Sequence, residues 1–181
     1  MDPRARVAVI GLGANLGDGA DTIRHALRAL AALPGCCVEA VSDLYRSAPV
    51  DAQGPDYWNA VALVRTTLPP LRLLDALQAI EQAHGRVRPA GVVNAPRTLD
   101  LDLLDLDGQT MSHPRLTLPH PRMHLRAFVL APLADVLPTW TLPDGTSAID
   151  AARNLRTQGQ RIERVGPCGA ADQPPCAANI R

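Results

Sequence analysis

The sequence predicts an α+β domain in which helices pack on a mostly antiparallel sheet. Apolar and β-branched runs at 7–10, 38–46, 57–66 and 98–106 predict strands, and amphipathic stretches predict a helix after the first run and another after the third. Glycine or proline stands near the breaks between them. The order strand, helix, strand, strand, helix, strand is that of a ferredoxin-like sheet, so we expect this fold.

The first strand, at 7–10, is expected to end at the glycine-rich loop 11–17. Asp21 or Thr22 then serves as the N-cap of a helix that reaches about Leu33. The loop is similar to a dinucleotide-binding fingerprint, but its third glycine comes one residue too late for that turn. The spacing therefore argues against a Rossmann-type cofactor site.

The strands at 38–46 and 57–66 are joined by a long loop, and long loops between strands often carry binding residues. A second amphipathic helix begins near Pro70, because proline suits a first helical turn, and it ends at Gly85. The stretch 85–96 contains glycine and proline without any periodicity. We therefore expect it to be a mobile loop that closes over bound ligands.

The strand at 98–106 is expected to turn at 107–108 into a hairpin, with the second strand near 116–118. Apolar patterns at 123–136 and 148–155 predict two further helices. These elements follow the ferredoxin-like series, so we expect them to be additions to the same domain rather than a second one.

The composition is typical of one globular domain, with 46% hydrophobic and 20% charged residues. We expect this domain to span 1–165 and a disordered tail to span 166–181, where glycine, proline and alanine dominate. The first apolar run is too short for a signal peptide or a membrane span, so we expect a cytoplasmic protein. The four cysteines lack metal-ligand spacing and are expected to be reduced.

The charge balance argues against nucleic acid or an anionic membrane as a partner. The chain has 18 basic and 18 acidic side chains, so nothing draws the whole protein to nucleic acid or to an anionic membrane. Every basic residue other than histidine is arginine, which leaves no lysine for a P-loop. We therefore expect a small-molecule substrate.

The strongest chemical signal is an alternating pair of aspartates, Asp100 and Asp102, in the last strand of the ferredoxin-like series. Strand alternation puts both on one face, with Cα atoms roughly 6.6 Å apart. Two carboxylates this close repel each other, whereas a pair of divalent ions would be held by them and would neutralise them. Oxygen ligands without nearby cysteine indicate magnesium rather than zinc. An exposed strand with a polar outer face is the alternative.

Basic residues on both sides of the aspartates favour a polyphosphate ligand. Guanidinium forks grip phosphate oxygens while metal ions neutralise the bridging ones. The basic residues near the pair in sequence are Arg86, Arg88, Arg97, His120, Arg122 and Arg126.

A second set of residues suits a flat heterocycle. The chain has only five aromatic residues, and Tyr57, Trp58 and Phe128 are three of them. Tyr57 and Phe128 are candidates for stacking on a ring, whereas we expect Trp58 to belong to the core. Asn59 stands on the same strand face as Tyr57, where its amide can both donate to and accept from a ring edge.

Seven motifs together resemble the pyrophosphokinase family of folate synthesis. They occur in the family's order across roughly residues 7–142, which makes the series far more specific than any single piece. They are Gly13-Ala14-Asn15-Leu16-Gly17, Tyr45-Arg46-Ser47, Pro55-Asp56-Tyr57-Trp58-Asn59, Gln78-Ala79-Ile80-Glu81, Gly85-Arg86-Val87-Arg88, Pro96-Arg97-Thr98-Leu99-Asp100-Leu101-Asp102 and Leu118-Pro119-His120.

The resemblance implies a three-layer α/β/α sandwich and a monomeric enzyme that needs two Mg²⁺ ions. The reaction implied is transfer of pyrophosphate from ATP to 6-hydroxymethyl-7,8-dihydropterin, with release of AMP. It also implies which residues are catalytic, namely Asp100, Asp102, Arg86 and Arg97, of which the two aspartates would hold both ions.

The resemblance further implies two sets of binding residues. The ATP set is Gln78, Glu81, Arg88, Leu103, Arg115, Thr117, His120 and Arg126, in which Arg115 and Thr117 would lie near the ribose and the backbone of Leu103 near the adenine. The pterin set is Ser47, Ala48, Val50, Tyr57, Asn59 and Phe128, with the two aromatic rings on either side of the pterin.

Two other functions stay open on the residues alone. A catalytically silent ferredoxin-like module that binds a nucleotide or RNA would favour surface aromatics on the central strands and a basic face. A two-metal nuclease or polymerase would favour a basic surface along the nucleic acid, which the zero net charge argues against.

Overall fold

The computed structural model describes residues 5–49, 54–85 and 98–169. The elements in chain order are β1 (Arg6–Ala14), α1 (Gly19–Ala32), β2 (Cys36–Val41), β3 (Leu44–Ser47), β4 (Tyr57–Thr66), α2 (Pro70–Ala83), β5 (Asp100–Leu106), β6 (Met111–His113), β7 (Leu116–Leu118), the 3₁₀ turn η1 (Met123–Leu125), α3 (Ala127–Val136), α4 (Ala148–Thr157) and β8 (Ile162–Gly166).

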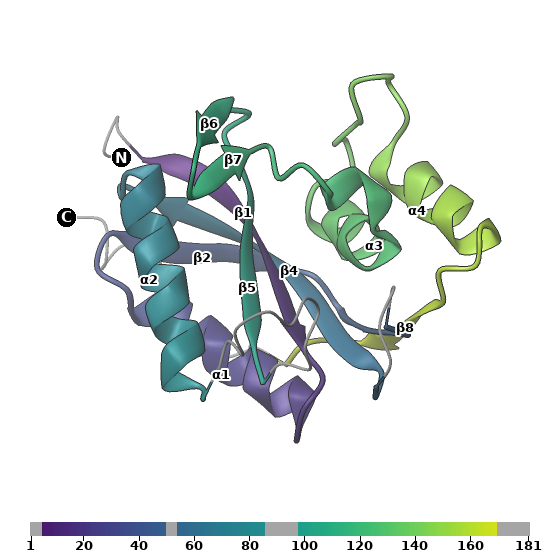
Figure 1. The fold of residues 1–181 in the computed structure, drawn as a ribbon, viewed down its shortest axis with the longest axis horizontal. Coiled ribbons are helices and arrows are strands. Elements are labelled where there is room, and N and C mark those ends of the chain that lie inside the picture. The colour runs from purple at the N-terminus through teal and green to yellow at the C-terminus, as the bar shows by residue number, and fades with distance from the viewer. Residues whose placement is uncertain (1–4, 50–53, 86–97, 170–181) are drawn as a thin grey trace.

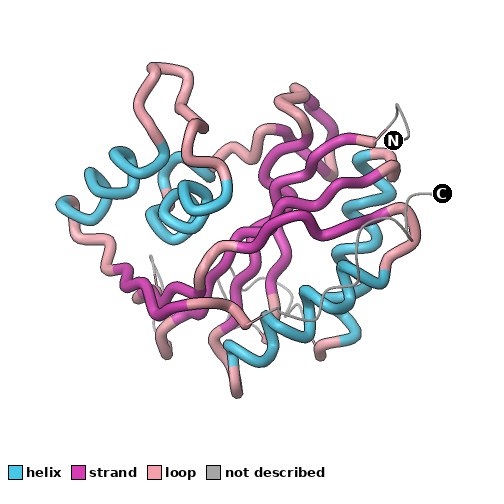
Figure 2. Tube along the Cα trace, turned by 180° about the vertical axis from the view of Figure 1, so that it is seen from behind, coloured by secondary structure: helices cyan, strands magenta, loops and turns pink. Residues whose placement is uncertain are grey.

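The predicted three-layer sandwich is confirmed. The main sheet has the strand order β5-β1-β4-β3-β8, β2 also pairs with β4, and every pairing in it is antiparallel. Helices α1 and α2 cover one face of this sheet and α3 and α4 cover the other (Figure 1). Figure 2 shows the same layers from behind, with the short β6-β7 hairpin outside them.

Two apolar cores lie on the two faces of the sheet, and β1 contributes to both. Ala8, Ile10 and Leu12 are buried against α1 and α2, whereas Val9 is buried with residues of α3 and α4. This is the alternation expected of a strand covered on both faces. It follows that Gly11, two residues after Val9, faces the same side as α3.

The first strand is longer than the sequence predicts. It continues through Gly11 and Gly13 of the expected loop and ends at Ala14, with β4 on one side and β5 on the other. Glycine is a poor strand former in isolation, but backbone hydrogen bonds to two neighbouring strands outweigh that preference here. The helix that follows begins earlier than predicted, because Asp18 is its N-cap and accepts a hydrogen bond from the Asp21 amide.

The predicted strand at 38–46 is two strands, β2 and β3, separated at Ser42 and Asp43. Both strands pair with β4, so the break is a local distortion in a segment that follows β4 along its length. The Ser42 backbone amide donates to the Val61 carbonyl, while its side-chain oxygen accepts from the Val61 amide at 3.0 Å. The serine side chain thus replaces a backbone acceptor where the strand is irregular.

Three other expectations about the C-terminal half need correction. The strand at 116–118 pairs with β6, which was not predicted from the sequence, and not with β5. The predicted helix at 123–136 is interrupted at Arg126, whose backbone is extended between η1 and α3. Strand β8 was also not predicted; it pairs with β3.

The folded part extends past the predicted domain end. Gly166 is the last residue of β8, and Cys168 is buried, with its carbonyl accepting from the Arg24 guanidinium at 2.8 Å. Residues 170–181 of the predicted tail lie outside the described residues. Cys36 and Cys168 are free thiols as expected, but Cys37 is disulfide-bonded, so the expectation of four reduced cysteines is wrong for it. No helix in the described part of the chain is long and apolar enough to cross a membrane.

Candidate active site

The candidate site lies on the α3 face of the sheet. Antiparallel pairing places Asp100 of β5 opposite Gly13 of β1, and Gly13 opposite Asn59 of β4. In the next row on the same face, Asp102 lies opposite Gly11. Residues directly opposite each other share a sheet face, so the two glycines form a floor without side chains between the aspartates and the asparagine.

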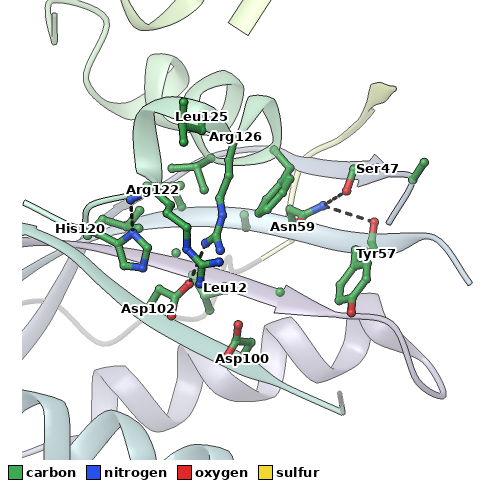
Figure 3. A pocket seen from close by; sticks show the side chains of 18 residues that line it. Leu12, Ser47, Tyr57, Asn59, Asp100, Asp102, His120, Arg122, Leu125 and Arg126 are labelled. Atoms are coloured by element: carbon green, nitrogen blue, oxygen red, sulfur yellow. Dashed lines mark hydrogen bonds and ion pairs between the residues drawn. The ribbon is translucent and has the colours of Figure 1, made fainter. Parts of the chain in front are cut away.

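A cavity of about 270 Å³ opens above this floor. Strands β1, β3, β4 and β5 form its base, and the segment that leads into α3 forms one wall (Figure 3). Its lining residues are Gly11, Leu12, Gly13, Ser47, Ala48, Tyr57, Asn59, Ala60, Val61, Asp100, Asp102, Leu104, His120, Arg122, Leu125, Arg126, Phe128 and Val129.

One end of the cavity carries the charged groups. Asp100 and Asp102 are partly exposed there, while Leu101 between them is buried, which confirms the predicted alternation along β5. The Arg126 guanidinium lies 3.5 Å from the Asp102 carboxylate. In Figure 3 the side chains of Arg122 and Arg126 both extend toward this carboxylate. Positive and negative groups are therefore arranged together, as a metal-bound polyphosphate requires.

His120 contributes a neutral imidazole to the same end. Burial lowers the pKa of His120, and the nearby Arg126 and Arg122 guanidiniums add to this by disfavouring a further positive charge, so that together they bring it to about 4. Its Nδ1 accepts a hydrogen bond from the Arg122 amide at 3.1 Å. The ring proton is therefore on Nε2 at neutral pH, where it can be donated to an anionic oxygen.

The other end carries the groups suited to a heterocycle. Asn59 is buried, and its Nδ2 donates to the Ser47 hydroxyl at 2.9 Å and to the Tyr57 carbonyl at 3.3 Å (Figure 3). The side-chain oxygen of Asn59 consequently points toward Gly13, 3.7 Å from where a Cβ on that residue would stand. This end of the cavity thus offers a fixed hydrogen-bond acceptor to a ring edge.

Gln160 holds the wall segment that presents Arg126. Its Oε1 accepts from the Ala127 amide and its Nε2 donates to the Leu125 carbonyl, both at 2.8 Å. One side chain therefore bonds the backbone on each side of Arg126, whose guanidinium lies 5.5 Å from the centre of the Phe128 ring. The break between η1 and α3 is stabilised in this way rather than left to solvent.

Tyr45 and Asp135 connect α3 to the sheet. The Tyr45 hydroxyl donates to the Asp135 carboxylate at 3.0 Å, and the Asp43 amide also donates to this carboxylate. Burial raises the pKa of Tyr45, and the hydrogen bond to Asp135 adds to this, so the hydroxyl stays protonated. The helix that carries Phe128 is thereby fixed against the strand that carries Ser47.

The structure brings together nine of the residues proposed from the sequence. They line one cavity and are Asp100, Asp102, His120, Arg126, Ser47, Ala48, Tyr57, Asn59 and Phe128. Trp58, expected in the core, is partly buried and packs against the apolar core on the α1 and α2 face of the sheet. Four proposed residues lie outside the described residues: Val50, Arg86, Arg88 and Arg97. The proposed mobile loop 85–96 lies there too, apart from Gly85.

Five residues proposed for ATP do not line this cavity. Leu103 is buried in β5, Arg115 pairs with Asp75 of α2, and Thr117 is exposed on β7. The other two are on α2, where Gln78 is partly exposed and Glu81 is buried. The Glu81 carboxylate accepts from the Leu101 amide at 2.7 Å, so it contacts the strand between the two aspartates.

Nine of the residues that line the cavity were not proposed as site residues from the sequence: Gly11, Leu12, Gly13, Ala60, Val61, Leu104, Arg122, Leu125 and Val129. Gly11 and Gly13 were placed in a loop, although they are strand residues of the cavity floor. Leu125, which is 52% exposed, and Val129 gave no signal because a single apolar residue near a helix looks like ordinary surface or core. Arg122 was noted only as a nearby charge, and its position on the wall depends on the turn before α3.

Comparison with known proteins identifies the family. Residues 9–138 match 7,8-dihydro-6-hydroxymethylpterin-pyrophosphokinase (HPPK). The chain is 50% identical over 137 residues to the 2-amino-4-hydroxy-6-hydroxymethyldihydropteridine pyrophosphokinase of Pseudomonas aeruginosa, covering 75% of this chain and 83% of the relative. It is 44% identical over 158 residues to the protein of the same name from Synechocystis, covering 87% of this chain and 75% of the relative.

Solved structures give the same fold. A wild-type HPPK-DHPS chain from Plasmodium falciparum matches with a TM-score of 0.67 at 13% identity, covering 85% of this chain. This chain spans only 45% of that longer protein, so the match concerns one part of it. At this identity the likeness supports the fold alone, and the family rests on the sequence matches. The chain belongs to the 7,8-dihydro-6-hydroxymethylpterin-pyrophosphokinase family, the pterin pyrophosphokinases of folate biosynthesis.

Proposed function

We propose that the chain transfers pyrophosphate from ATP to 6-hydroxymethyl-7,8-dihydropterin within the cavity above Gly11 and Gly13, giving AMP and the pterin diphosphate. The observation that carries this proposal is the division of one cavity into two ends. Carboxylates and arginines suit a metal-bound triphosphate, whereas a fixed amide with two aromatic rings suits a pterin. The floor between them has no side chains to separate the two substrates.

The donor set at the charged end fits Mg²⁺. Asp100 and Asp102 offer only oxygen ligands, and within the described residues no group of three or more His, Cys, Asp or Glu could hold a metal by itself. Magnesium commonly takes one or two carboxylates and completes its shell with water and substrate phosphates. Two bound Mg²⁺ ions would neutralise charge on the bridging phosphate oxygens.

The protein's own residues orient and stabilise the reacting groups. Asn59 accepts from the pterin edge, while Tyr57 and Phe128 hold its ring, so that the hydroxymethyl group points along the floor toward the aspartates. The hydroxymethyl oxygen then attacks the β-phosphorus in line, the bond from this phosphorus to the α,β-bridging oxygen breaks so that AMP leaves, and the hydroxyl proton passes to water. Arg126 exchanges its contact with Asp102 for the phosphates and, with the Nε2 proton of His120, stabilises the negative charge that develops there.

We infer that the ATP contacts are divided between this cavity and the surface next to it. The triphosphate lies at the aspartates, so the nucleoside extends beyond the described cavity toward α2 and the β6-β7 hairpin, where Gln78, Arg115 and Thr117 lie. We place the adenine and ribose there. We also expect the protein to act as a cytoplasmic monomer, with no nucleic-acid or membrane partner. Sedimentation with both substrates present tests whether it is a monomer.

The test of this function is product analysis. Protein, ATP, Mg²⁺ and the pterin alcohol should yield AMP and the pterin diphosphate in equal amounts by phosphorus NMR. The Asp102→Asn variant serves as a folded control that should form neither product at a comparable rate. ADP or free phosphate as the main phosphorus product would show that a different group is transferred.

A further inference from the structure

Gly13 lies between the two ends of the cavity. Its cross-strand partners are Asp100 on one side and Asn59 on the other. Neighbouring strands lie about 4.8 Å apart, so these three residues form a row about 10 Å long across the sheet. The row begins at a proposed metal ligand and ends at the amide that accepts from the pterin.

Neither backbone conformation nor packing in the free protein requires a glycine at this position. The φ angle of Gly13 is not among the positive values that favour glycine. Among the described residues, a Cβ on Gly13 would meet only the Asn59 Oδ1 within 4 Å, at an ordinary contact distance of 3.7 Å. Gly19 differs, because a Cβ there would stand 2.5 Å from the Trp58 ring. Glycine also weakens a strand relative to alanine, so its presence at 13 needs another reason.

The orientation of Asn59 supplies that reason. Its Nδ2 is held by Ser47 and by the Tyr57 carbonyl, which leaves Oδ1 directed at the space above Gly13. A ring N–H that donates to this oxygen would lie about 3 Å from it. A methyl group on Gly13, at 3.7 Å from the same oxygen, would compete for that space.

We propose that Gly13 determines substrate specificity, because its missing side chain leaves room for a flat, hydrogen-bond-donating ring to lie between Asn59 and Asp100. This inference rests on the proposed function, since it assumes that a pterin occupies that end of the cavity. Gly13 acts by leaving space and not by chemistry. A side chain here therefore affects the ring-binding end without removing any group from the charged end.

The test compares wild type with Gly13→Ala and Gly13→Ser. Calorimetry measures binding of 6-hydroxymethyl-7,8-dihydropterin in the presence of Mg²⁺ and a non-hydrolysable ATP analogue, and binding of that analogue with Mg²⁺ alone. Thermal unfolding of the free proteins measures whether the strand tolerates the new side chain. We expect pterin affinity to fall at least tenfold in both variants, analogue affinity to stay within twofold, and the Tm to stay the same or rise.

The outcomes separate this inference from the proposed function. If wild type forms AMP and Gly13→Ala binds pterin within threefold of wild type, the specificity role is wrong while the function stands. If the Tm of either variant falls, or affinity for both ligands falls together, Gly13 is a structural residue and the inference is also wrong. If wild type binds no pterin and forms no AMP, the proposed function itself fails.

Discussion

Replacing Glu81 with alanine should destabilise the strand that carries both aspartates. Strand β5 is at the edge of the sheet, and no strand among the described residues pairs with the Leu101 amide on its outer side. Glu81 is 2% exposed, and its carboxylate accepts from this amide at 2.7 Å. A hydrogen bond to a charged group contributes about 1.5–3 kcal/mol. With the lost packing of its stem, Glu81→Ala should lower the free energy of unfolding by about 2–4 kcal/mol.

Two further variants isolate the hydrogen bond. Glu81→Gln keeps an acceptor of the same shape, so it should lose only about 1 kcal/mol. Gln82→Ala, an exposed change on the next residue of α2, should stay within about 0.5 kcal/mol of wild type. Urea unfolding gives all three free energies, and hydrogen exchange at the Leu101 amide reports the strand edge directly, where Glu81→Ala should exchange fastest.

The contrary result is also specific. If Glu81 acted mainly by contacting the nucleotide, as its sequence motif suggests, alanine would weaken ATP binding and leave both stability and Leu101 exchange unchanged. That pattern would refute the structural role derived from the buried contact. A loss of stability equal to that of Gln82→Ala would refute it as well.

Three more predictions concern the cavity. Asp102→Asn should lower kcat at least a hundredfold through lost charge stabilisation, with a cooperative unfolding transition retained in circular dichroism. Tyr57→Ala should weaken pterin binding by about 1–3 kcal/mol in calorimetry and leave ATP binding nearly unchanged. Because the pKa of His120 is lowered to about 4, its ring should not titrate in NMR between pH 5 and 8. Its contribution to the free energy of unfolding should be present above about pH 6.5 and be lost as the pH falls toward 4.

Each of these has a result that counts against it. Turnover of Asp102→Asn within a few-fold of wild type would show that the charge of Asp102 is not needed for the reaction. A larger effect of Tyr57→Ala on ATP than on pterin would place the ring elsewhere. A His120 resonance that shifts with a midpoint near pH 6.5 would mean that the ring is solvated and carries no lowered pKa.

Local patterns in the sequence were enough for residues that share one strand. Asp100 and Asp102 face the same side because side chains alternate with a period of two, and Tyr57 and Asn59 follow the same rule. These pairs are fixed by covalent spacing and a strand conformation alone. The family motifs, which keep their order along the chain, carried the rest of the functional expectation.

The tertiary structure decided how those pairs meet. Gly11 and Gly13 looked like a loop because glycine has a low strand propensity, and only pairing with β4 and β5 makes them strand residues. The same pairing register puts Gly13 between Asp100 and Asn59, although these two residues are 41 positions apart in the printed sequence.

The wall of the cavity depended equally on distant residues. Arg126 is presented where a predicted helix breaks, and Gln160, from beyond α4, supplies the hydrogen bonds that replace helical ones there. The Glu81 carboxylate likewise accepts a hydrogen bond from the Leu101 amide, 20 residues further along the chain. The sequence by itself determined the fold class, the family and the paired aspartates, because those depend on local periodicity and motif order. Register, strand continuity and buried partners depend on which segments pack together, and local periodicity does not encode that choice.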